Sequence, residues 1–299
     1  MIKRIVDISE PAYLHSQHSQ LCIDKNRQTI AQIPIEDLGV LILQHPAIVL
    51  TQAALIQCQH NNVAVVFCDE RHLPYALILP LTDGHTLHSK VLQQQIKLTV
   101  PIKKRLWQRI VLEKIANQIH VLQQLDRNTK PLERMLGKVK LGDSANIEAQ
   151  AAQQYWRLLF GPDFRRDTEA GGINGLLNYG YAVMRAMVAR AIVGGGLHPT
   201  IGIKHCNQYN DLCLADDLME PLRPWVDWLV YLQNYNTPSP EVDRNTKQPL
   251  LKLLNAPVEW NRKNMPMMVA CHYLLADFKR AFEDKSIKLV FPRPLSIDL

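Results

Sequence analysis

Short apolar runs dominate the first 80 or so residues of the chain. They include KRIVDIS, QLCID, GVLILQ, VAVVFC and YALILPL, some with apolar and polar positions in alternation, a pattern typical of β-strands. Turn-forming segments such as Lys25-Asn26-Arg27 and Asn61-Asn62 separate them. One helix is predicted from Thr51 to His60, with Thr51 as its N-cap. The pattern favours a small sandwich-like β-domain over a parallel α/β sheet.

The pattern changes after the polar segment LTDGHTLHSK (81–90), which we interpret as a linker. Beyond it, apolar residues recur at helical spacing from Leu106, and Pro101 marks a helix start. Further helices are expected over 144–160, 174–193, 214–232, 246–254 and 264–284, and a tail from Val290. We therefore predict an α+β fold, with a β-rich domain over residues 1–85 and a larger, all-helical domain over 86–299.

The composition is that of a globular protein. The chain has 299 residues, of which 47% are hydrophobic and 21% charged, enough apolar surface for a core and too little charge for disorder. The segment MIKRIVDISE lacks the apolar stretch of a secretory signal, and no apolar run reaches membrane-spanning length. We therefore expect a cytoplasmic protein without membrane contact. The 6 cysteines show no C-x-x-C spacing, which favours reduced thiols over a disulfide scaffold or zinc ribbon.

The net charge of +6 is unevenly distributed. Residues 1–85 carry 5 Lys and Arg against 8 Asp and Glu, whereas residues 90–140 carry 12 Lys and Arg against 3 Asp and Glu. A basic region of this size suits a polyanionic partner, although a solvated helix face would have the same composition. The basic residues at the start of the first long helix are Lys103, Lys104, Arg105 and Arg109.

The segment HCNQYNDLCLADDLMEPLR (205–223) concentrates the side chains that could carry chemistry. Asp217 and Glu220 are three positions apart and would share one face of a helix. Carboxylates beside apolar neighbours need a partner, and carboxylate oxygens together with the imidazole of His205 suit Mn²⁺ or Mg²⁺. Acids in the first turns of a helix also interact favourably with the helix dipole. Spacing alone leaves both interpretations open.

Three segments taken together resemble a known family. They are Ile147-Glu148-Ala149-Gln150-Ala151-Ala152 with Tyr155-Trp156, the run GINGLLNYGY (172–181), and the stretch from Gly196-Leu197-His198-Pro199 through Gly202 and His205 to DLMEPLRP (217–224). In order and spacing they are similar to the CRISPR-associated integrase of spacer acquisition, over essentially the whole chain and with wording closest to the type II form. One departure is Leu222, where Phe is common.

The resemblance implies a metal-dependent DNA endonuclease and integrase, with its catalytic site in the helical domain. The catalytic residues and metal ligands would be Glu148, His205 and Glu220, holding Mg²⁺ or Mn²⁺, with Asp217 as an accessory acid. Spacing alone would leave Glu148 an ordinary helix residue. A 3′-hydroxyl of short duplex DNA would attack a phosphodiester of a CRISPR array, and water in its place would give nuclease activity. From the charge of the stretch 90–140, and not from the resemblance, we expect Lys103, Lys104, Arg105 and Arg109 to bind DNA phosphates without reading bases.

The resemblance also implies partners. They are duplex DNA, a second copy of the chain in a homodimer, a small ferredoxin-like CRISPR adaptation protein of the endoribonuclease type, and other type II CRISPR proteins. Two alternatives stay open. One is a non-enzymatic DNA-binding scaffold of a nucleoprotein complex, and the other is a metal-dependent hydrolase of small phosphates, against which the basic stretch argues. Since His205 must be neutral to bind a metal, we expect activity to fall below about pH 6.

Overall fold

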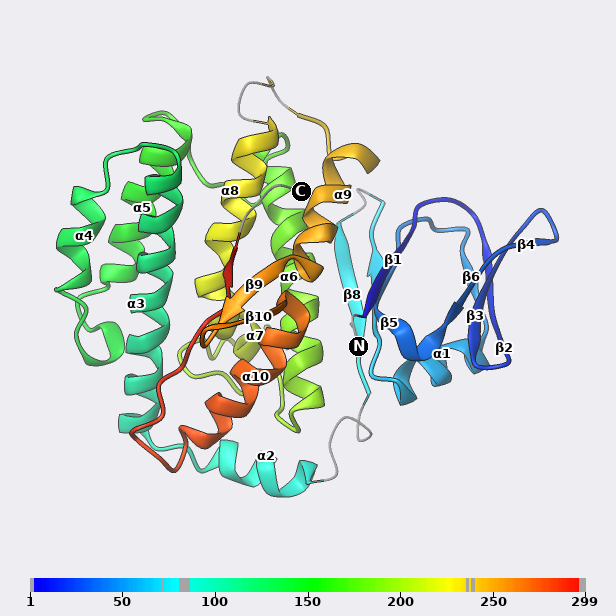
Figure 1. Cartoon of the computed structure of the whole chain (residues 1–299), viewed down its shortest axis with the longest axis horizontal. Helices are drawn as coiled ribbons and strands as arrows, with labels where there is room; N and C mark the ends of the chain where they lie inside the picture. The colour runs from blue at the N-terminus through cyan, green and yellow to red at the C-terminus, as the bar shows by residue number, and fades with distance from the viewer. Residues whose placement is uncertain (1–2, 71–72, 81–86, 235–236, 238–239, 296–299) are drawn as a thin grey trace.

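The computed structural model describes residues 3–70, 73–80, 87–234, 237 and 240–295. Two β-sheets lie at one end of the molecule and a larger group of helices at the other (Figure 1). The predicted α+β class is confirmed, with strands first in the chain and a mostly helical part after them. Of the predicted linker over 81–90, residues 81–86 lie outside the described residues, as does the boundary at residue 85. Residues 88–90 are helical, so the predicted end of the linker at residue 90 was wrong.

The first sheet has the strand order β1-β5-β7-β8. Its first three strands pair in parallel and β8 pairs antiparallel to β7. The parallel pairs differ from the prediction and have a topological cause, because helix α1 (Gln52–His60) lies between β5 and β7 in the chain and allows the crossover that parallel strands need. Its strands are β1 (Arg4–Ile8), β5 (Leu38–Leu43), β7 (Ala64–Cys68) and β8 (Pro74–Ile78).

The second sheet has the order β4-β3-β2-β6 and shares an apolar core with the first. Two sheets around one core agree with the sandwich-like prediction. The predicted cap of α1 is also confirmed, since the side chain of Thr51 accepts a hydrogen bond from the amide of Ala54 at 3.3 Å. The strands are β2 (Tyr13–Gln17), β3 (Gln20–Lys25), β4 (Gln28–Pro34) and β6 (Val49–Leu50), with a 3-10 turn, η1 (Ile35–Asp37), before β5.

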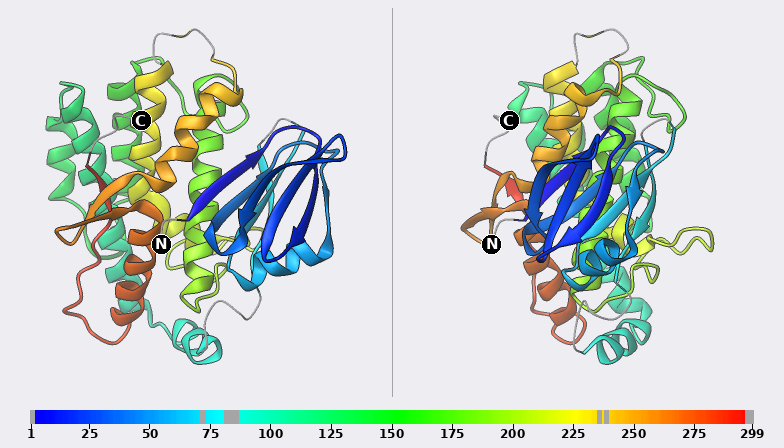
Figure 2. Two further views of the ribbon diagram at one scale, coloured as in Figure 1. Left: turned by 45° about the vertical axis from the view of Figure 1, so that its right-hand side comes forward. Right: turned by 90° about the vertical axis from the view of Figure 1, so that its right-hand side faces the viewer.

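Strand β5 joins the two halves of the molecule. Leu41 and Leu43 belong to the core between the sheets, whereas Val40 and Ile42 belong to the core of the helical part. Both faces of the strand are therefore covered, which explains its continuous apolar sequence. The cover on the outer face is α6 (Ile173–Gly194), which lies against the first sheet and also packs on four helices of the C-terminal part (Figure 2).

The C-terminal part begins with α2 (His88–Ile96), α3 (Val100–Gln124) and α4 (Lys130–Leu136), followed by η2 (Leu141–Asp143) and α5 (Ile147–Phe160). After α6 come α7 (Cys213–Met219), η3 (Glu220–Leu222), α8 (Arg223–Asn234), α9 (Arg244–Lys252), η4 (Leu253–Asn255) and α10 (Met267–Arg280). Pro101 lies in the first turn of α3, as predicted. The single helix predicted over 214–232 is instead interrupted by η3, where Pro221 and Pro224 remove backbone donors.

The prediction of an all-helical C-terminal domain was wrong in one region. Strands β9 (Pro257–Trp260) and β10 (Lys263–Pro266) form a hairpin, and β11 (Arg293–Pro294) pairs with β9. Asn261 and Arg262 both have positive φ, 49° and 64°, as a two-residue hairpin turn requires. The predicted tail is also wrong over its first residues, because Phe291 is buried and the indole of Trp260 donates to the carbonyl of Val290 at 3.0 Å.

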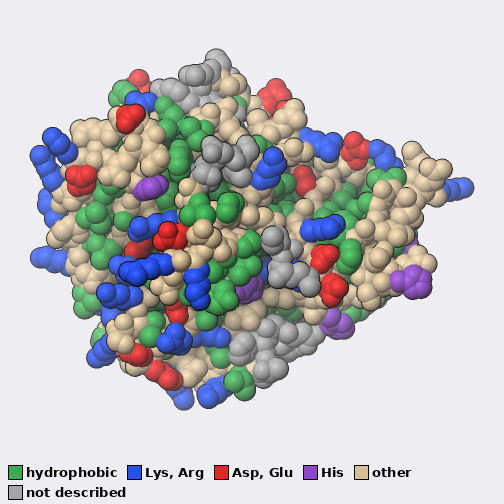
Figure 3. Space-filling model, in the orientation of Figure 1, with side chains coloured by type: hydrophobic (Ala, Val, Ile, Leu, Met, Phe, Trp, Pro, Cys, Tyr) green, Lys and Arg blue, Asp and Glu red, His purple; other side chains and the backbone are tan. Residues whose placement is uncertain are grey.

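The surface carries the uneven charge that the sequence predicts. In the space-filling view, Lys and Arg side chains gather on the side of the molecule formed by α3, α4 and α5 (Figure 3). Over the described part of the chain, none of the helices combines the length and the apolar character needed to cross a membrane.

Candidate active site

Helix α3 is the platform of the candidate site. Its buried residues include Trp107 and the polar residues Lys114, Asn117 and Gln118. Asn117 and Gln118 follow Lys114 by three and four positions and so lie within about one turn of it. Asn117 donates to the carbonyl of Pro221 at 2.7 Å and so attaches η3 to α3. The other three face the catalytic candidates.

Lys114 lies between two carboxylates that are distant in sequence. Its ammonium donates to Glu148 Oε1, and to Glu220 Oε2 at 2.5 Å. The side chains are 10% exposed for Lys114, 23% for Glu148 and 8% for Glu220, so solvent screens this cluster weakly. The structure thus brings Glu148 and Glu220 together around a positive charge.

The two buried charges stabilise each other. Burial alone would lower the pKa of Lys114, but Glu220 and Glu148 outweigh it and hold that pKa above its ordinary value. Burial would raise the pKa of Glu220, but Arg223 and Lys114 lower it below its ordinary value. Arg223 contributes because its Nε lies 3.1 Å from Glu220 Oε1. Lys114 and Glu220 are therefore charged at neutral pH.

Glu148 is positioned by the first turn of α5. The carboxylate of Asp143 accepts hydrogen bonds from the amides of Ile147 at 2.8 Å and Glu148 at 3.0 Å, which satisfies two amides that a helix start leaves unpaired. The predicted helix start at Ser144 was wrong for this reason. The chain turns through Asp143 and Asn146, both with positive φ, before α5 begins.

His205 is oriented by Asp217. The ring Nδ1 lies 2.6 Å from Asp217 Oδ1, and the amides of Ile203 and Lys204 donate to Asp217 Oδ2 at 2.6 and 3.0 Å. The loop therefore wraps around a carboxylate that is fully buried. The hydrogen bond to Asp217 raises the pKa of His205, with burial opposing it. An imidazole that donates Nδ1–H to a carboxylate has Nε2 left for a metal ion.

The structure arranges the acids differently from the spacing argument. Asp217 and Glu220 do not act as a pair, since Asp217 holds His205 and Glu220 holds Lys114. Within the described residues, no group of three or more His, Cys, Asp or Glu side chains is arranged to hold a metal ion. Glu148 and Glu220 share the ammonium of Lys114, and His205 is close enough to Glu220 for each to shift the pKa of the other. The set of Glu148, His205 and Glu220 remains a prediction.

A cavity of about 230 Å³ opens beside the carboxylates. Six of the residues that line it are Lys114, Gln118, Glu148, Arg166, Tyr181 and Glu220. Asp227 also lines it and accepts a hydrogen bond from the hydroxyl of Tyr181. Burial raises the pKa of Asp227 to about 7, although Tyr181 and Arg223 oppose the shift.

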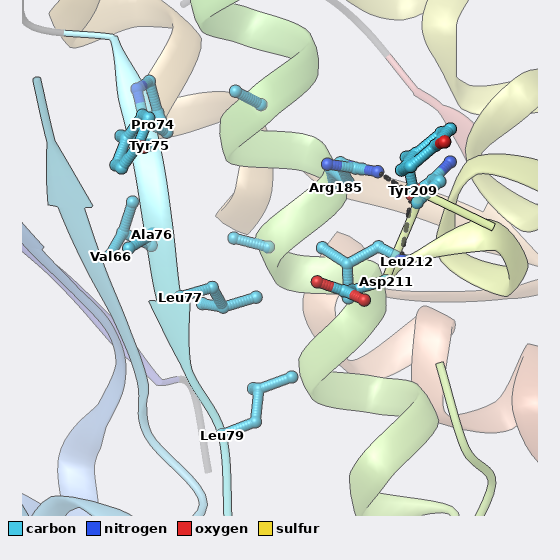
Figure 4. Close-up of a pocket in the computed structure, with 13 residues that line it drawn as sticks. Val66, Pro74, Tyr75, Ala76, Leu77, Leu79, Arg185, Tyr209, Asp211 and Leu212 are labelled. Atoms are coloured by element: carbon cyan, nitrogen blue, oxygen red, sulfur yellow. Dashed lines mark hydrogen bonds between the residues drawn. The ribbon is translucent and has the colours of Figure 1, made fainter. Parts of the chain in front are cut away.

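A larger groove, of about 580 Å³, lies between β8 and α6 (Figure 4). Its lining includes Tyr75, Leu77 and Tyr209, and none of the predicted ligands. The guanidinium of Arg185 at its wall is bound to Asp216 at 2.7 Å. Because none of the predicted ligands is among the described residues that line it, size alone does not make it the active site.

The predicted DNA-binding residues of α3 have contacts within the protein. Arg105 donates to the carbonyl of Ala281 at 2.6 Å, and Arg109 donates to the carbonyl of Leu289 at 3.2 Å and lies 2.5 Å from Glu113. Lys103 lies 3.4 Å from the carbonyl of Gly202, and Lys104 is exposed. Two of the four basic side chains thus hold the C-terminal segment, and their role in DNA binding stays a prediction.

Sequence reasoning missed Lys114, Gln118 and Arg166. A signal was present for the first two, because Lys114 and Gln118 fall among Val111, Ile115 and Ile119 on the buried side of a long helix. A polar residue at such a position needs a buried partner. No local signal marked Arg166, which comes from a loop.

A family model and individual relatives indicate the same protein family. The chain matches the family described as "CRISPR associated protein Cas1" over residues 6–241. The CRISPR-associated endonuclease Cas1 of Neisseria meningitidis serogroup C (strain 8013) is 34% identical over 291 residues, 96% of this chain and 95% of that protein. CRISPR-associated endonuclease Cas1 2 of Saccharolobus solfataricus is 25% identical over 276 residues, 87% of this chain and 86% of that protein.

Solved structures share the fold. A casposase bound to integration product has a TM-score of 0.74 and 21% identity, covering 100% of this chain and 96% of that chain. A Cas1 protein from Thermotoga maritima has a TM-score of 0.77 and 16% identity, covering 93% and 97%. Because the family match spans most of the sequence and the Neisseria relative covers nearly all of it, the chain belongs to the Cas1 family of CRISPR-associated proteins.

Proposed function

We propose that this chain is a metal-dependent DNA endonuclease and integrase of CRISPR adaptation, of the type II form and acting in the cytoplasm. The observation that carries the proposal is the pair of weakly exposed carboxylates, Glu148 and Glu220, held around a cation. The names of similar proteins support this class of reaction. One relative is named as an endonuclease, and one structure of similar fold is a casposase bound to integration product.

The types of side chain present suit a divalent cation, which they would have to converge on to bind. Two carboxylates that converge on an ammonium, with a histidine whose Nε2 is directed away from its acid partner, form a donor set of oxygen and nitrogen that suits Mn²⁺ or Mg²⁺. Glu148, Glu220 and His205 would hold the ion. Once bound, it lowers the pKa of an attacking hydroxyl and offsets charge on the phosphate.

The chain's own residues prepare the site for that chemistry. Asp217 fixes the ring orientation of His205, and Asp143 fixes the start of the helix that carries Glu148. Lys114 and Arg223 keep Glu220 ionised, which a metal ligand must be. A 3′-hydroxyl of duplex DNA attacks a phosphodiester of the array and displaces the 3′-oxygen of the cut strand, while water in place of that hydroxyl gives cleavage.

The proposal includes partners. A structure of similar fold is a complex of Cas6-RT-Cas1 with Cas2, with a TM-score of 0.77 and 16% identity over 98% of this chain and 36% of that one. We propose that the present chain likewise binds duplex DNA and a small, ferredoxin-like adaptation protein, and that it acts as a homodimer. The DNA would approach the basic side formed by α3–α5 (Figure 3).

A strand-joining assay tests the proposal. Glu148→Gln and Glu220→Gln remove one ligand charge each with little change in shape, and Glu133→Gln, on the exposed surface of α4, is the matched control. With Mn²⁺, the adaptation partner and a plasmid carrying a repeat array, we expect the first two variants to lose about a hundredfold or more of joining. Undiminished Mn²⁺-dependent joining by Glu220→Gln would falsify the ligand assignment. Metal-independent DNA binding without joining by the wild type would favour the scaffold alternative.

A further inference from the structure

The cavity beside the carboxylates has a feature that the metal site does not require. Arg166 and Arg223 lie near the same ring, with their guanidinium carbons 5.4 and 4.8 Å from the ring centroid of Tyr181. Arg223 is neutralised by Glu220. Arg166 also lines the cavity, and the hydrogen bonds it makes go to a backbone carbonyl and two side-chain amides rather than to a carboxylate.

The guanidinium of Arg166 is held by hydrogen bonds that use only some of its N–H donors. Its Nη1 donates to the carbonyl of Asp167 at 2.9 Å and to Asn174 at 3.0 Å, and its Nη2 donates to Asn178 at 2.5 Å. These three bonds fix the plane of the group. A guanidinium has five N–H donors, so two remain, one on Nε and one on Nη2. Arginine in this state suits an anion such as a phosphate.

A buried polar group that lines the same cavity gives independent support. Gln118 is 2% exposed and lines the cavity, and its Oε1 has no hydrogen-bond partner in the described part of the chain. A buried polar atom left without a partner is costly. Its place in a cavity that opens beside Glu148 and Glu220 indicates that the partner comes from a bound molecule.

We infer that this cavity binds a backbone phosphodiester of the DNA strand that enters the active site, with Arg166 contacting the phosphate and Gln118 the adjoining sugar–phosphate group. The inference rests on the proposed function for the identity of the ligand. A rigid arginine beside the ligands Glu148 and Glu220 would fix the strand relative to the reacting atoms, and such fixing contributes to the rate. Arg166 is thereby a binding residue and not a metal ligand.

Two variants separate a binding role from a structural one. Arg166→Gln removes the charge but also the bonds to Asn174 and Asn178, and it could loosen the loop. Gln118→Leu removes an amide whose Oε1 has no hydrogen-bond partner in the described part of the chain, so the fold should be about as stable as the wild type. Arg244→Gln is the control for charge, because Arg244 is exposed at the start of α9 and does not line the cavity.

The experiment measures binding of a fluorescein-labelled short duplex DNA by anisotropy over a range of salt, with chelator present so that binding is separated from chemistry. For Arg166→Gln we expect binding about tenfold weaker, with the slope of log K against log [salt] smaller by about 0.9. For Gln118→Leu we expect weaker binding at unchanged thermal stability. Arg244→Gln should leave both quantities near wild type.

The outcomes distinguish this inference from the proposed function. If Arg166→Gln and Gln118→Leu bind DNA with the wild-type affinity and salt slope, the phosphate site is wrong, whatever the joining assay shows. If both variants weaken binding while the wild type joins no DNA with any divalent ion, the phosphate site stands and the integrase proposal fails. Arg166→Lys adds a test of geometry, since it keeps the charge and loses the planar fork. Full recovery of binding by that variant would exclude two-bond recognition of the phosphate.

Discussion

Asp217 and His205 form a pair in which a fully buried carboxylate lies 2.6 Å from Nδ1 of a half-exposed imidazole. The same carboxylate accepts amide hydrogen bonds from Ile203 and Lys204, so the backbone just before His205 is fixed to it. The pair therefore sets both the tautomer and the direction of the ring. Any metal bound at Nε2 depends on a residue that does not touch it.

This pair predicts the pH dependence of metal binding. Because Asp217 raises the pKa of His205 above 6.5, a proton competes for the imidazole at higher pH than in an isolated histidine. As the pH is lowered, affinity for Mn²⁺ should therefore begin to fall while the pH is still above 6.5. The sequence alone predicts this loss only below about pH 6. Asp217→Asn should move the midpoint to lower pH in calorimetric titrations at several pH values. An unmoved midpoint in that variant, once its fold is verified, would contradict the assignment.

The contribution of this pair to the free energy of unfolding of the metal-free protein should decrease as the pH rises, whereas Mn²⁺ affinity increases. A histidine with a raised folded-state pKa contributes stability that is fully present below the unfolded pKa of 6.5 and is lost as pH rises through the folded value. Urea denaturation in chelator should therefore show a contribution that declines above pH 6.5 in the wild type. The contribution should be absent in His205→Gln, whereas a decline of equal size in that variant would assign it to another group.

Lys114→Met tests whether the ammonium occupies the place of a metal cation. Removing one member of a buried charge cluster costs about 3–5 kcal/mol, and here it leaves Glu148 and Glu220 facing each other. We expect the variant to unfold more easily than the wild type in chelator and to gain more thermal stability from Mn²⁺. Lys130→Met, exposed at the start of α4, is the control. A variant with wild-type stability in chelator would show that Lys114 is not needed as a counter-ion.

The sequence predicted best where local signals decide the structure. The cap at Thr51, the proline at the start of α3 and the strands of the first sheet each depend on a few adjacent residues. The hairpin of β9 and β10 was missed because both strands are short, and Arg293 of β11 pairs with Glu259 of β9 across 34 positions of the chain. Pairing at such separation leaves no periodic signal in either segment.

The candidate site was only partly accessible for a related reason. Resemblance supplied Glu148, His205 and Glu220, but nothing in the spacing joins Lys114 to partners 34 and 106 positions away. Asp217 and Glu220 share a short segment and were expected to act as a pair, yet Asp217 binds His205 and Glu220 binds Lys114. Tertiary contacts, rather than helical spacing, determine which acid serves which partner.

Substitution of Asp143 should affect both the start of helix α5 and the position of Glu148. Asp143→Ala removes the acceptor for the amides of Ile147 and Glu148, which should cost about 1 kcal/mol in the free energy of unfolding. Asp143→Asn should cost less, since asparagine tolerates the positive φ of 50° and keeps one acceptor oxygen. Urea denaturation and Mn²⁺ titration measure the two effects. Equal stability of the Ala and Asn variants would show that the cap contributes little.

Gly202→Ala should disturb the loop that carries His205. A Cβ at this position would lie 2.2 Å from the carbonyl oxygen of His205 and 2.9 Å from Asp217 Oδ2, so backbone would have to move. Overpacking of this kind costs about 1–3 kcal/mol, and the displaced loop should weaken Mn²⁺ binding as well. Gly137→Ala is the control, because nothing lies within 4 Å of its Cβ and its φ is −67°, and it should be neutral or stabilising by less than about 1 kcal/mol. If Gly202→Ala melts and binds Mn²⁺ like the wild type, the close approach of this loop to Asp217 does not position His205.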